Sequence, residues 1–159
     1  MQASEEIFEL IRDERGGVAN IHRAFDQFPQ GVSAHYFFYR QILLADNLPL
    51  DRKEREFLAV KTSEANQCPY CIGHHTAAFE SIDTGSIRNQ RLVALEKLAY
   101  TLTREPWKSG LIKDLFLSSG FTSAQWQHAV MIVSYFNFAN RCAHAMSLEL
   151  EDNFKDSCR

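Results

Sequence analysis

The stretch Glu54–His75, EREFLAVKTSEANQCPYCIGHH, decides how this chain folds. Its first part, residues 54–61, spaces charged and apolar residues as a helix does rather than alternating them as a strand does. The next part opens on Cys68-Pro69-Tyr70-Cys71, where Pro69 suits the first turn of a helix because its missing N–H removes no hydrogen bond there. The stretch therefore predicts two helices joined by a turn near residues 66–67.

The rest of the chain continues the helical pattern, interrupted by only four prolines and seven glycines, and contains no convincing strand. Asp51 with Glu54, and Thr122 with Gln125, resemble capping boxes that open helices. Helices are expected over residues 4–15, 18–28, 35–46, 51–66, 68–82, 87–102, 111–117 and 123–148. We therefore predict an all-α fold, as a single domain over residues 1–159 with a polar tail from about residue 149.

Composition describes a globular protein of 159 residues, 45% hydrophobic and 23% charged, with a net charge of -3. A chain without basic excess is not expected to bind nucleic acid. No stretch approaches the roughly 18 apolar residues of a membrane span, and the acidic start lacks the basic region of a signal peptide. Four cysteines, at 68, 71, 142 and 158, are too few for a secreted disulfide framework. We expect a cytoplasmic protein with no membrane partner.

The CxxC motif indicates redox chemistry, because one oxidised sulfur can be captured by the other without large backbone motion. Cys68, Cys71 and His75 fall at i, i+3 and i+7 of a helix and are expected to share a face, whereas His74 is expected to point elsewhere. Glu56 lies on the preceding helix, which can fold back as an antiparallel hairpin. The carboxylate, the imidazole and the two thiols would then form a proton relay.

Other interpretations of the cysteines stay open. They could be buried structural residues capped by His75. Cys68 and Cys71 could instead join Cys142 and His144 as the zinc ligands of a non-catalytic helical binding or interaction module. That zinc site is disfavoured, because Cys142 and His144 lie two residues apart and should point to different helix faces. Under the redox interpretation no metal or cofactor is expected.

The motif Cys-Pro-Tyr-Cys is also that of a glutaredoxin active site, which belongs to a different architecture. That motif follows a buried strand, whereas the residues before Cys68 have helical charge spacing. None of Pro29, Pro49 and Pro106 lies in a strand-like stretch that could supply the cis-proline of that fold. We therefore reject the glutaredoxin fold for this chain but retain dithiol redox chemistry as the interpretation of the motif.

The segment Glu56–His75 resembles the alkylhydroperoxidase D-like (AhpD-like) branch of the carboxymuconolactone decarboxylase superfamily. A glutamate stands 12 positions before the first cysteine and a histidine four positions after the second, and Asn66 and Asn140-Arg141 also fit. The resemblance implies an all-α, AhpD-like helical domain with the CxxC at the start of a helix. It also implies burial of apolar helices between subunits, in a homo-oligomer that is a dimer, a trimer or a hexamer.

The resemblance further implies a thiol-dependent antioxidant enzyme, a peroxidase or disulfide reductase whose catalytic residues are Cys71, Cys68, Glu56 and His75. Its substrate would be a hydroperoxide or a disulfide. Its partner would be a thiol reductant system, such as a lipoyl protein, a thioredoxin-like protein or another dithiol.

The sequence departs from well-studied members at Tyr70, where they carry a second histidine. A tyrosine of pKa about 10 cannot exchange protons near neutrality as imidazole can, which weakens hydroperoxide turnover more than dithiol exchange. The attacking cysteine is left open. The helix start favours Cys68 as the thiolate, whereas the resemblance favours Cys71 as the attacking sulfur and Cys68 as the one that closes the disulfide.

Other residues of interest are expected to be structural. His22, His35 and His128 have no partners at ligand spacing and are expected to be satisfied core or surface groups. The aromatic run 36–39 is expected in the core or at a subunit interface. Cys142 and Cys158 are expected to be a structural thiol and a tail thiol.

Oxidation is expected to convert the reduced protein to a form about two mass units lighter, bridged between Cys68 and Cys71, because their separation permits a disulfide. Peptide mapping locates the bridge. A bridge at Cys142 or Cys158 instead would mean that the CxxC is not the redox centre.

Overall fold

The computed structural model describes residues 2–83 and 86–157, and within them the chain forms helices and no strand. The all-α prediction is therefore confirmed. In chain order the elements are α1 (Gln2–Arg15), α2 (Asn20–Arg23), α3 (Pro29–Tyr39), the π-helical η1 (Arg40–Leu44), α4 (Arg52–Ala65), α5 (Pro69–Ser81), α6 (Asn89–Arg104), the 3₁₀-helical η2 (Pro106–Ile112), α7 (Lys113–Ser118), α8 (Ser123–Ala145) and the 3₁₀-helical η3 (Phe154–Ser157). Among the described helices, none is both long and apolar enough to cross a bilayer.

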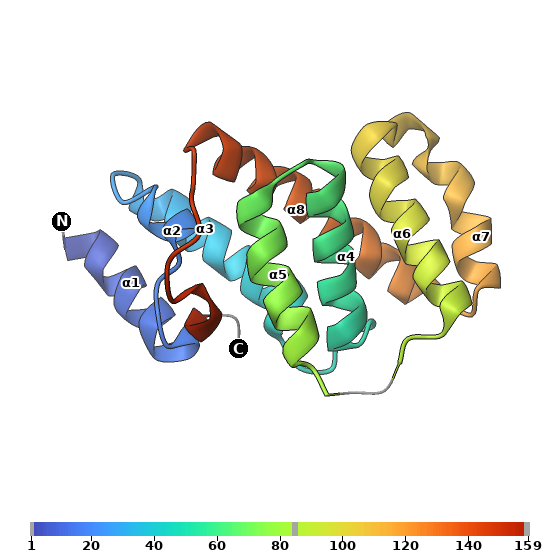
Figure 1. Ribbon diagram of the computed structural model, residues 1–159, viewed down its shortest axis with the longest axis horizontal. Helices are drawn as coiled ribbons and strands as arrows, with labels where there is room; N and C mark the ends of the chain where they lie inside the picture. The colour runs from blue at the N-terminus through green and yellow to red at the C-terminus, as the bar shows by residue number, and fades with distance from the viewer. Residues whose placement is uncertain (1, 84–85, 158–159) are drawn as a thin grey trace.

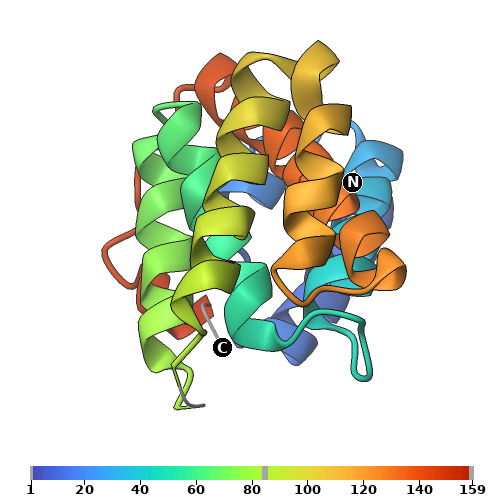
Figure 2. The same ribbon diagram turned by 90° about the vertical axis from the view of Figure 1, so that its right-hand side faces the viewer.

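Helix α4 is the centre of the arrangement and packs against α5, α6 and α8. Helices α1, α2 and α3 gather at one end of the molecule, and α6 and α7 gather at the other (Figure 1). Seen from that second end, α6 and α7 lie in front and α5 runs alongside α4 (Figure 2). The hairpin of α4 and α5 predicted from the sequence is therefore present.

Buried apolar side chains of the described residues form three clusters. The largest joins α4, α6 and α8 through fully buried residues such as Leu58, Leu98 and Ile132. A second cluster holds α1 against α3 and includes Ile11 and Tyr36. The third is small and contains the CxxC cysteines with Tyr70 and Ala143, so the motif is itself part of the protein interior.

The N-terminal region differs from the sequence prediction. A single helix over 18–28 is wrong, because only α2 is helical there and turns follow it. Pro29 does not merely end a helix but opens α3 at its first position, where a residue without an N–H fits. Helix α3 therefore starts before residue 35 and continues into η1. The aromatic run is divided, since Tyr36 is fully buried while Phe37 and Phe38 are exposed.

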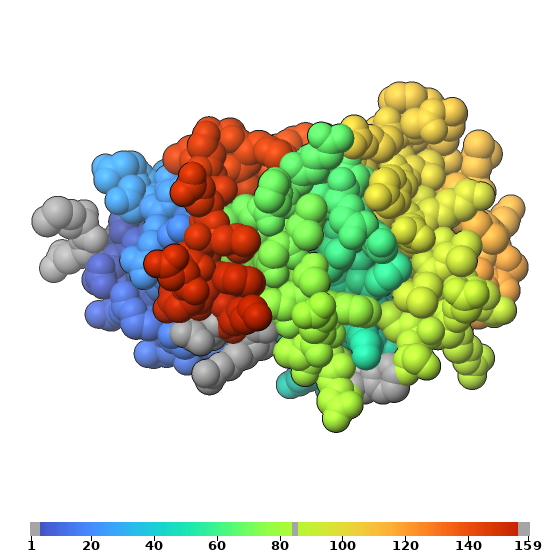
Figure 3. All heavy atoms as spheres, in the orientation of Figure 1, coloured from blue at the N-terminus to red at the C-terminus, as the bar shows by residue number. Residues whose placement is uncertain are grey.

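The residues after α8, which the sequence presents as a polar tail, turn back and pack on α5. We call residues 146–155 the C-terminal segment. Figure 3 shows it lying between the N-terminal helices and α5. The Leu150 side chain lies directly over Gly73, where an added Cβ would stand 2.6 Å from Leu150 Cδ1. The ring of Phe154 packs against His74 at 5.5 Å between centroids. The segment thus covers the helix that carries the cysteines.

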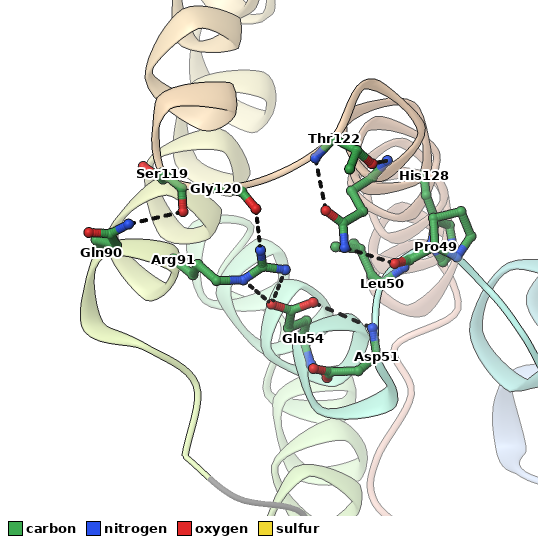
Figure 4. A network of polar contacts seen from close by, with 11 residues as sticks. Pro49, Leu50, Asp51, Glu54, Gln90, Arg91, Ser119, Gly120, Thr122 and His128 are labelled. Atoms are coloured by element: carbon green, nitrogen blue, oxygen red, sulfur yellow. Dashed lines mark hydrogen bonds and ion pairs between the residues drawn. The ribbon is translucent and has the colours of Figure 1, made fainter.

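The start of α4 is fixed by a polar network (Figure 4). The predicted capping box is present, because Asp51 Oδ1 accepts from the Glu54 N–H at 2.8 Å and the Glu54 carboxylate accepts from the Asp51 N–H at 3.4 Å. Arg91 of α6 lies 2.6 Å from the same carboxylate and donates to the Gly120 carbonyl at 2.8 Å. The network therefore joins α4 to α6 and to the loop before α8.

His128 of α8 extends this support. Its Nδ1 accepts from the Leu50 N–H at 3.2 Å, so Nε2 carries the hydrogen that it donates to the Ile42 carbonyl at 2.7 Å. Both ring nitrogens are used, which confirms His128 as a satisfied core group. The capping box predicted for Thr122 and Gln125 is also present at the start of α8.

Arg91→Met is expected to lower the free energy of unfolding by about 3 kcal/mol, because it leaves the buried Glu54 carboxylate without its cation. Burial already raises the pKa of Glu54. Ionisation of Glu54 therefore favours the unfolded state. The loss of unfolding free energy in Arg91→Met should be smaller at about pH 5, where more of Glu54 is protonated, than at about pH 7.5. Urea denaturation at both pH values measures it. Lys97→Met, at an exposed position of α6, is the control. An equal effect of both substitutions would contradict the role of Arg91.

Candidate active site

The CxxC motif opens α5 as predicted. Cys68 is the N-cap residue and Pro69 occupies the first helical position. Both cysteines are unbridged thiols, exposed by only 1% for Cys68 and 4% for Cys71. The motif is therefore held inside the protein, so its chemistry depends on the groups that surround it.

The two thiols interact directly and titrate as a pair. Hydrogen bonding from the Cys71 thiol lowers the pKa of Cys68 to about 6, although burial alone would raise it. His144 and Asn140 also lower the pKa of Cys68. The same hydrogen bond, with burial added, raises the pKa of Cys71 well above its ordinary value. The pair therefore favours a thiolate on Cys68 and a proton on Cys71.

Polar groups of α8 and of the turn before α5 support the thiols from one side. Asn140 is fully buried, donates to Ser63 Oγ at 3.0 Å and accepts from Asn66 Nδ2 at 2.9 Å. His144 Nε2 lies 3.0 Å from the Asn66 carbonyl oxygen. Asn66 and Asn140, singled out in the sequence through the resemblance alone, thus belong to the surroundings of the cysteines.

Glu56 and His75 meet across the α4–α5 hairpin. The fully buried Glu56 carboxylate lies 2.7 Å from His75 Nδ1 through Oε2, and its Oε1 accepts from Arg52 Nε at 2.9 Å and Nη2 at 2.6 Å. Burial acts to raise the pKa of Glu56, but His75 and Arg52 outweigh it and hold that pKa below its ordinary value. An ionised carboxylate at Nδ1 keeps the hydrogen on that nitrogen and leaves Nε2 as the acceptor. The ring of Phe136 holds the imidazole edge-on at 4.6 Å.

A pocket of about 70 Å³ lies between α5, α8 and the N-terminal helices. Cys71 and His75 are part of its wall, and Cys68 is not. Five aromatic side chains contribute to the wall, those of Tyr36, Tyr39, Tyr70, Tyr135 and Phe136. The structure therefore brings together the four residues predicted from the sequence and presents the second cysteine, rather than the first, to the space where a small molecule fits.

The expectation that His74 points away from this site is wrong, because His74 lines the same pocket. It lies three residues after Cys71, a spacing that places side chains on one helix face. Its Nε2 is 2.8 Å from Glu151 Oε2. Tyr70 donates to Glu151 Oε1 at 3.2 Å, and burial raises the pKa of this phenol further above neutrality.

Sequence reasoning missed Arg52 and Glu151. Arg52 stands four residues before Glu56 on the same helix, so the spacing of an ion pair was visible in the sequence. Glu151 offered no such signal, because its partners lie far away along the chain.

Of the remaining histidines, His35 is a satisfied core group, since its Nε2 lies 2.7 Å from the Tyr135 hydroxyl. His22 is buried, lines the pocket and has an Nδ1 atom without a hydrogen-bond partner. Burial first, and His35 next, lower the pKa of His22 to about 3, so its ring is neutral near pH 7.

The structure gives the zinc alternative no support. Within residues 2–83 and 86–157, no three side chains of His, Cys, Asp or Glu gather as metal ligands, and this includes Cys68, Cys71, Cys142 and His144. Cys142 is a partly exposed thiol, and Cys158 lies outside the described residues.

Comparison with known proteins finds a family model that matches part of the chain and solved structures that share its fold. Residues 32–82, which contain the four predicted site residues, match the sequence model of the carboxymuconolactone decarboxylase family. An uncharacterized peroxidase-related protein from Silicibacter sp. TM1040 superposes with a TM-score of 0.82 at 22% identity, over 100% of this chain and 90% of that one. A search of curated proteins found no match.

Two further structures share the architecture. An uncharacterized peroxidase-related protein from Ralstonia eutropha JMP134, described as an alkylhydroperoxidase AhpD core, gives a TM-score of 0.82 at 21% identity over 100% of this chain and 90% of that one. The apo debrominase Bmp8 superposes with a TM-score of 0.71 at 18% identity, over 98% of this chain and 91% of that one. The AhpD-like helical fold implied by the resemblance is confirmed, and residues 32–82 match the family that the resemblance names. Because these identities are all below 25%, the structures establish the fold alone.

The thiolate absorbance of the reduced protein is expected to titrate with a midpoint near pH 6, the pKa of Cys68. Cys71→Ala should move the midpoint up toward the ordinary thiol value of about 8.5, because it removes the largest cause of the shift. Cys142→Ser should leave it in place. A midpoint that does not move in Cys71→Ala would show that the two sulfurs are not coupled.

Proposed function

We propose that the protein is a thiol-dependent oxidoreductase that reduces hydroperoxides, disulfides or both through a redox-active Cys68–Cys71 pair. One observation carries the proposal. Cys71, whose thiol is coupled to that of Cys68, lines a pocket whose wall also holds His75, paired with the buried Glu56 carboxylate. Such a site contains a nucleophile, a resolving thiol and an acid–base group.

The reaction with a hydroperoxide begins with transfer of the Cys71 proton to the Cys68 thiolate, which leaves the thiolate on the sulfur that lines the pocket. That thiolate attacks the terminal peroxide oxygen, the O–O bond breaks, and the alkoxide takes the proton from Cys68 and leaves as the alcohol. Cys71 is now a sulfenic acid. The Cys68 thiolate attacks its sulfur, forms the disulfide and expels hydroxide. The peroxide has gained the two electrons that the thiols lost.

His75 serves this sequence as the group that moves protons through water at Nε2, while Glu56 holds its other nitrogen. Tyr70 takes no part in proton transfer, because burial keeps its pKa far above neutrality. The departure from the family at this position is therefore compatible with turnover if His75 alone carries the acid–base role.

A dithiol such as a lipoyl protein or a thioredoxin-like protein would restore the thiols by exchange through a mixed disulfide. With a disulfide as substrate, the same exchange runs in the opposite direction. We place the protein in the cytoplasm, where such reductants keep cysteines reduced. The exposed apolar side chains of Phe37, Phe38, Met131 and Phe138 support a homo-oligomer, whether dimer, trimer or hexamer.

Glu56→Gln and His75→Asn are each expected to slow oxidation of the thiols by hydroperoxide by roughly 100-fold or more, the scale of a lost general acid–base group. Stopped-flow measurement of thiol loss tests this. Glu64→Gln makes the same change on α4, at a residue paired with Lys61 away from the pocket, and should leave the rate unchanged. An unchanged rate in Glu56→Gln would show that the relay does not exist.

Cys71→Ser is expected to abolish turnover, whereas Cys68→Ser should stop at a Cys71 sulfenic acid that a selective trapping reagent labels. Mass spectrometry after peroxide treatment reads out the label. Labelling of Cys68 in the Cys71→Ser protein, without labelling of Cys71 in the converse variant, would reverse the roles of the two cysteines.

A further inference from the structure

We propose that Glu151 is a specificity-determining residue: it ties α2 to α5 across the edge of the pocket and so limits the size of molecule that reaches Cys71. The inference rests on the proposed function only in taking this pocket as the place where substrate binds. The width of the pocket itself depends on the fold and not on the proposed reaction.

The Glu151 carboxylate joins groups from both sides of the pocket. Its Oε1 accepts from the backbone N–H of Asn20, in α2, and from the Tyr70 hydroxyl at 3.2 Å. Its Oε2 lies 2.8 Å from Nε2 of His74, which like Tyr70 belongs to α5. Although burial opposes ionisation, the hydrogen bonds from His74 and Asn20 lower the pKa of Glu151 to about 2. The group is thus a charged acceptor, and charged acceptors make the stronger hydrogen bonds.

The groups that Glu151 joins are walls of the pocket or their direct neighbours. Tyr70 and His74 line it from α5, and Ile21 lines it from α2, next to Asn20. The Tyr70 hydroxyl also accepts from the Ile21 N–H at 3.1 Å. The Tyr70 hydroxyl therefore accepts a hydrogen bond from the Ile21 N–H and donates one to the Glu151 carboxylate. A single hydroxyl oxygen can do both.

The C-terminal segment is held in place on both sides of Glu151. Asn20 Nδ2 donates to the Glu149 carbonyl at 3.2 Å, Leu150 lies over Gly73, and the Phe154 ring packs on His74. The carboxylate is consequently fixed in position before any substrate arrives. Loss of its charge would weaken the connection between α5 and α2, a helix of four residues.

Thiol reagents of different size test this without any enzymatic turnover. In the Cys142→Ser, Cys158→Ser protein, Cys71 is modified with iodoacetamide and with the bulkier N-phenylmaleimide, and peptide mass mapping gives both rates. Both reagents react with the Cys71 thiolate, so a change in the fraction of Cys71 that is ionised affects both rates equally and leaves their ratio unchanged. Glu151→Gln, which keeps the shape and removes the charge, should raise the ratio of bulky to small reagent by roughly tenfold, the scale of a lost charged hydrogen bond.

Glu149→Gln is the matched control, because its side chain is exposed and the backbone carbonyl that Asn20 contacts is unaffected. It should leave the ratio unchanged. Tyr70→Phe, which removes the hydroxyl alone, should raise the ratio as Glu151→Gln does, and it decides the question if Glu151→Gln does not fold.

An unchanged ratio in a folded Glu151→Gln or Tyr70→Phe protein would overturn the proposal. The proposed function fails by a different result, namely absence of turnover with hydroperoxide and with disulfide, and the reagent ratio is readable in either case. In a protein that does turn over, Glu151→Gln should lower KM for cumene hydroperoxide relative to KM for hydrogen peroxide.

Discussion

The buried Glu56 carboxylate is the constraint on which the rest of the site depends. A charge removed from water is tolerated only when it is paired and hydrogen-bonded, and here Arg52 and His75 supply both. His75 can do so only if α5 lies alongside α4 in one register. That register also sets where α5 begins, and therefore where the two cysteines lie. The acid–base pair and the thiol pair are positioned by the same electrostatic requirement.

The site separates two properties that the sequence left in conflict. The start of α5 and the hydrogen bond from Cys71 favour the thiolate on Cys68, whereas the pocket is open to Cys71. These two properties are compatible because the two sulfurs share one proton. The thiolate can reside on Cys68 in the resting protein and on Cys71 when the proton moves to Cys68. Asn140, buried and hydrogen-bonded to Ser63 and Asn66, helps to lower the pKa of Cys68.

What the sequence predicted correctly was local. The capping boxes, the proline at the start of α5 and the hairpin that brings Glu56 to His75 are set by residues a few positions apart or on adjacent helices. Pro29 was ambiguous, since proline both ends one helix and begins the next. The contacts of Glu151 could not be predicted, because they join residues 77 to 131 positions apart and no periodic pattern encodes them.

The separation between Glu151 and Asn20 has a consequence for synthesis of the chain. Both cysteines, Glu56 and His75 are synthesised before the carboxylate that joins α2 to α5, which emerges 131 residues after Asn20. A nascent chain that has not yet reached this residue can form the α4–α5 hairpin while one wall of its pocket stays untied. Long-range contacts of this kind close late in folding. The residues of the hairpin would therefore be in place before the contact that joins α2 to α5 forms.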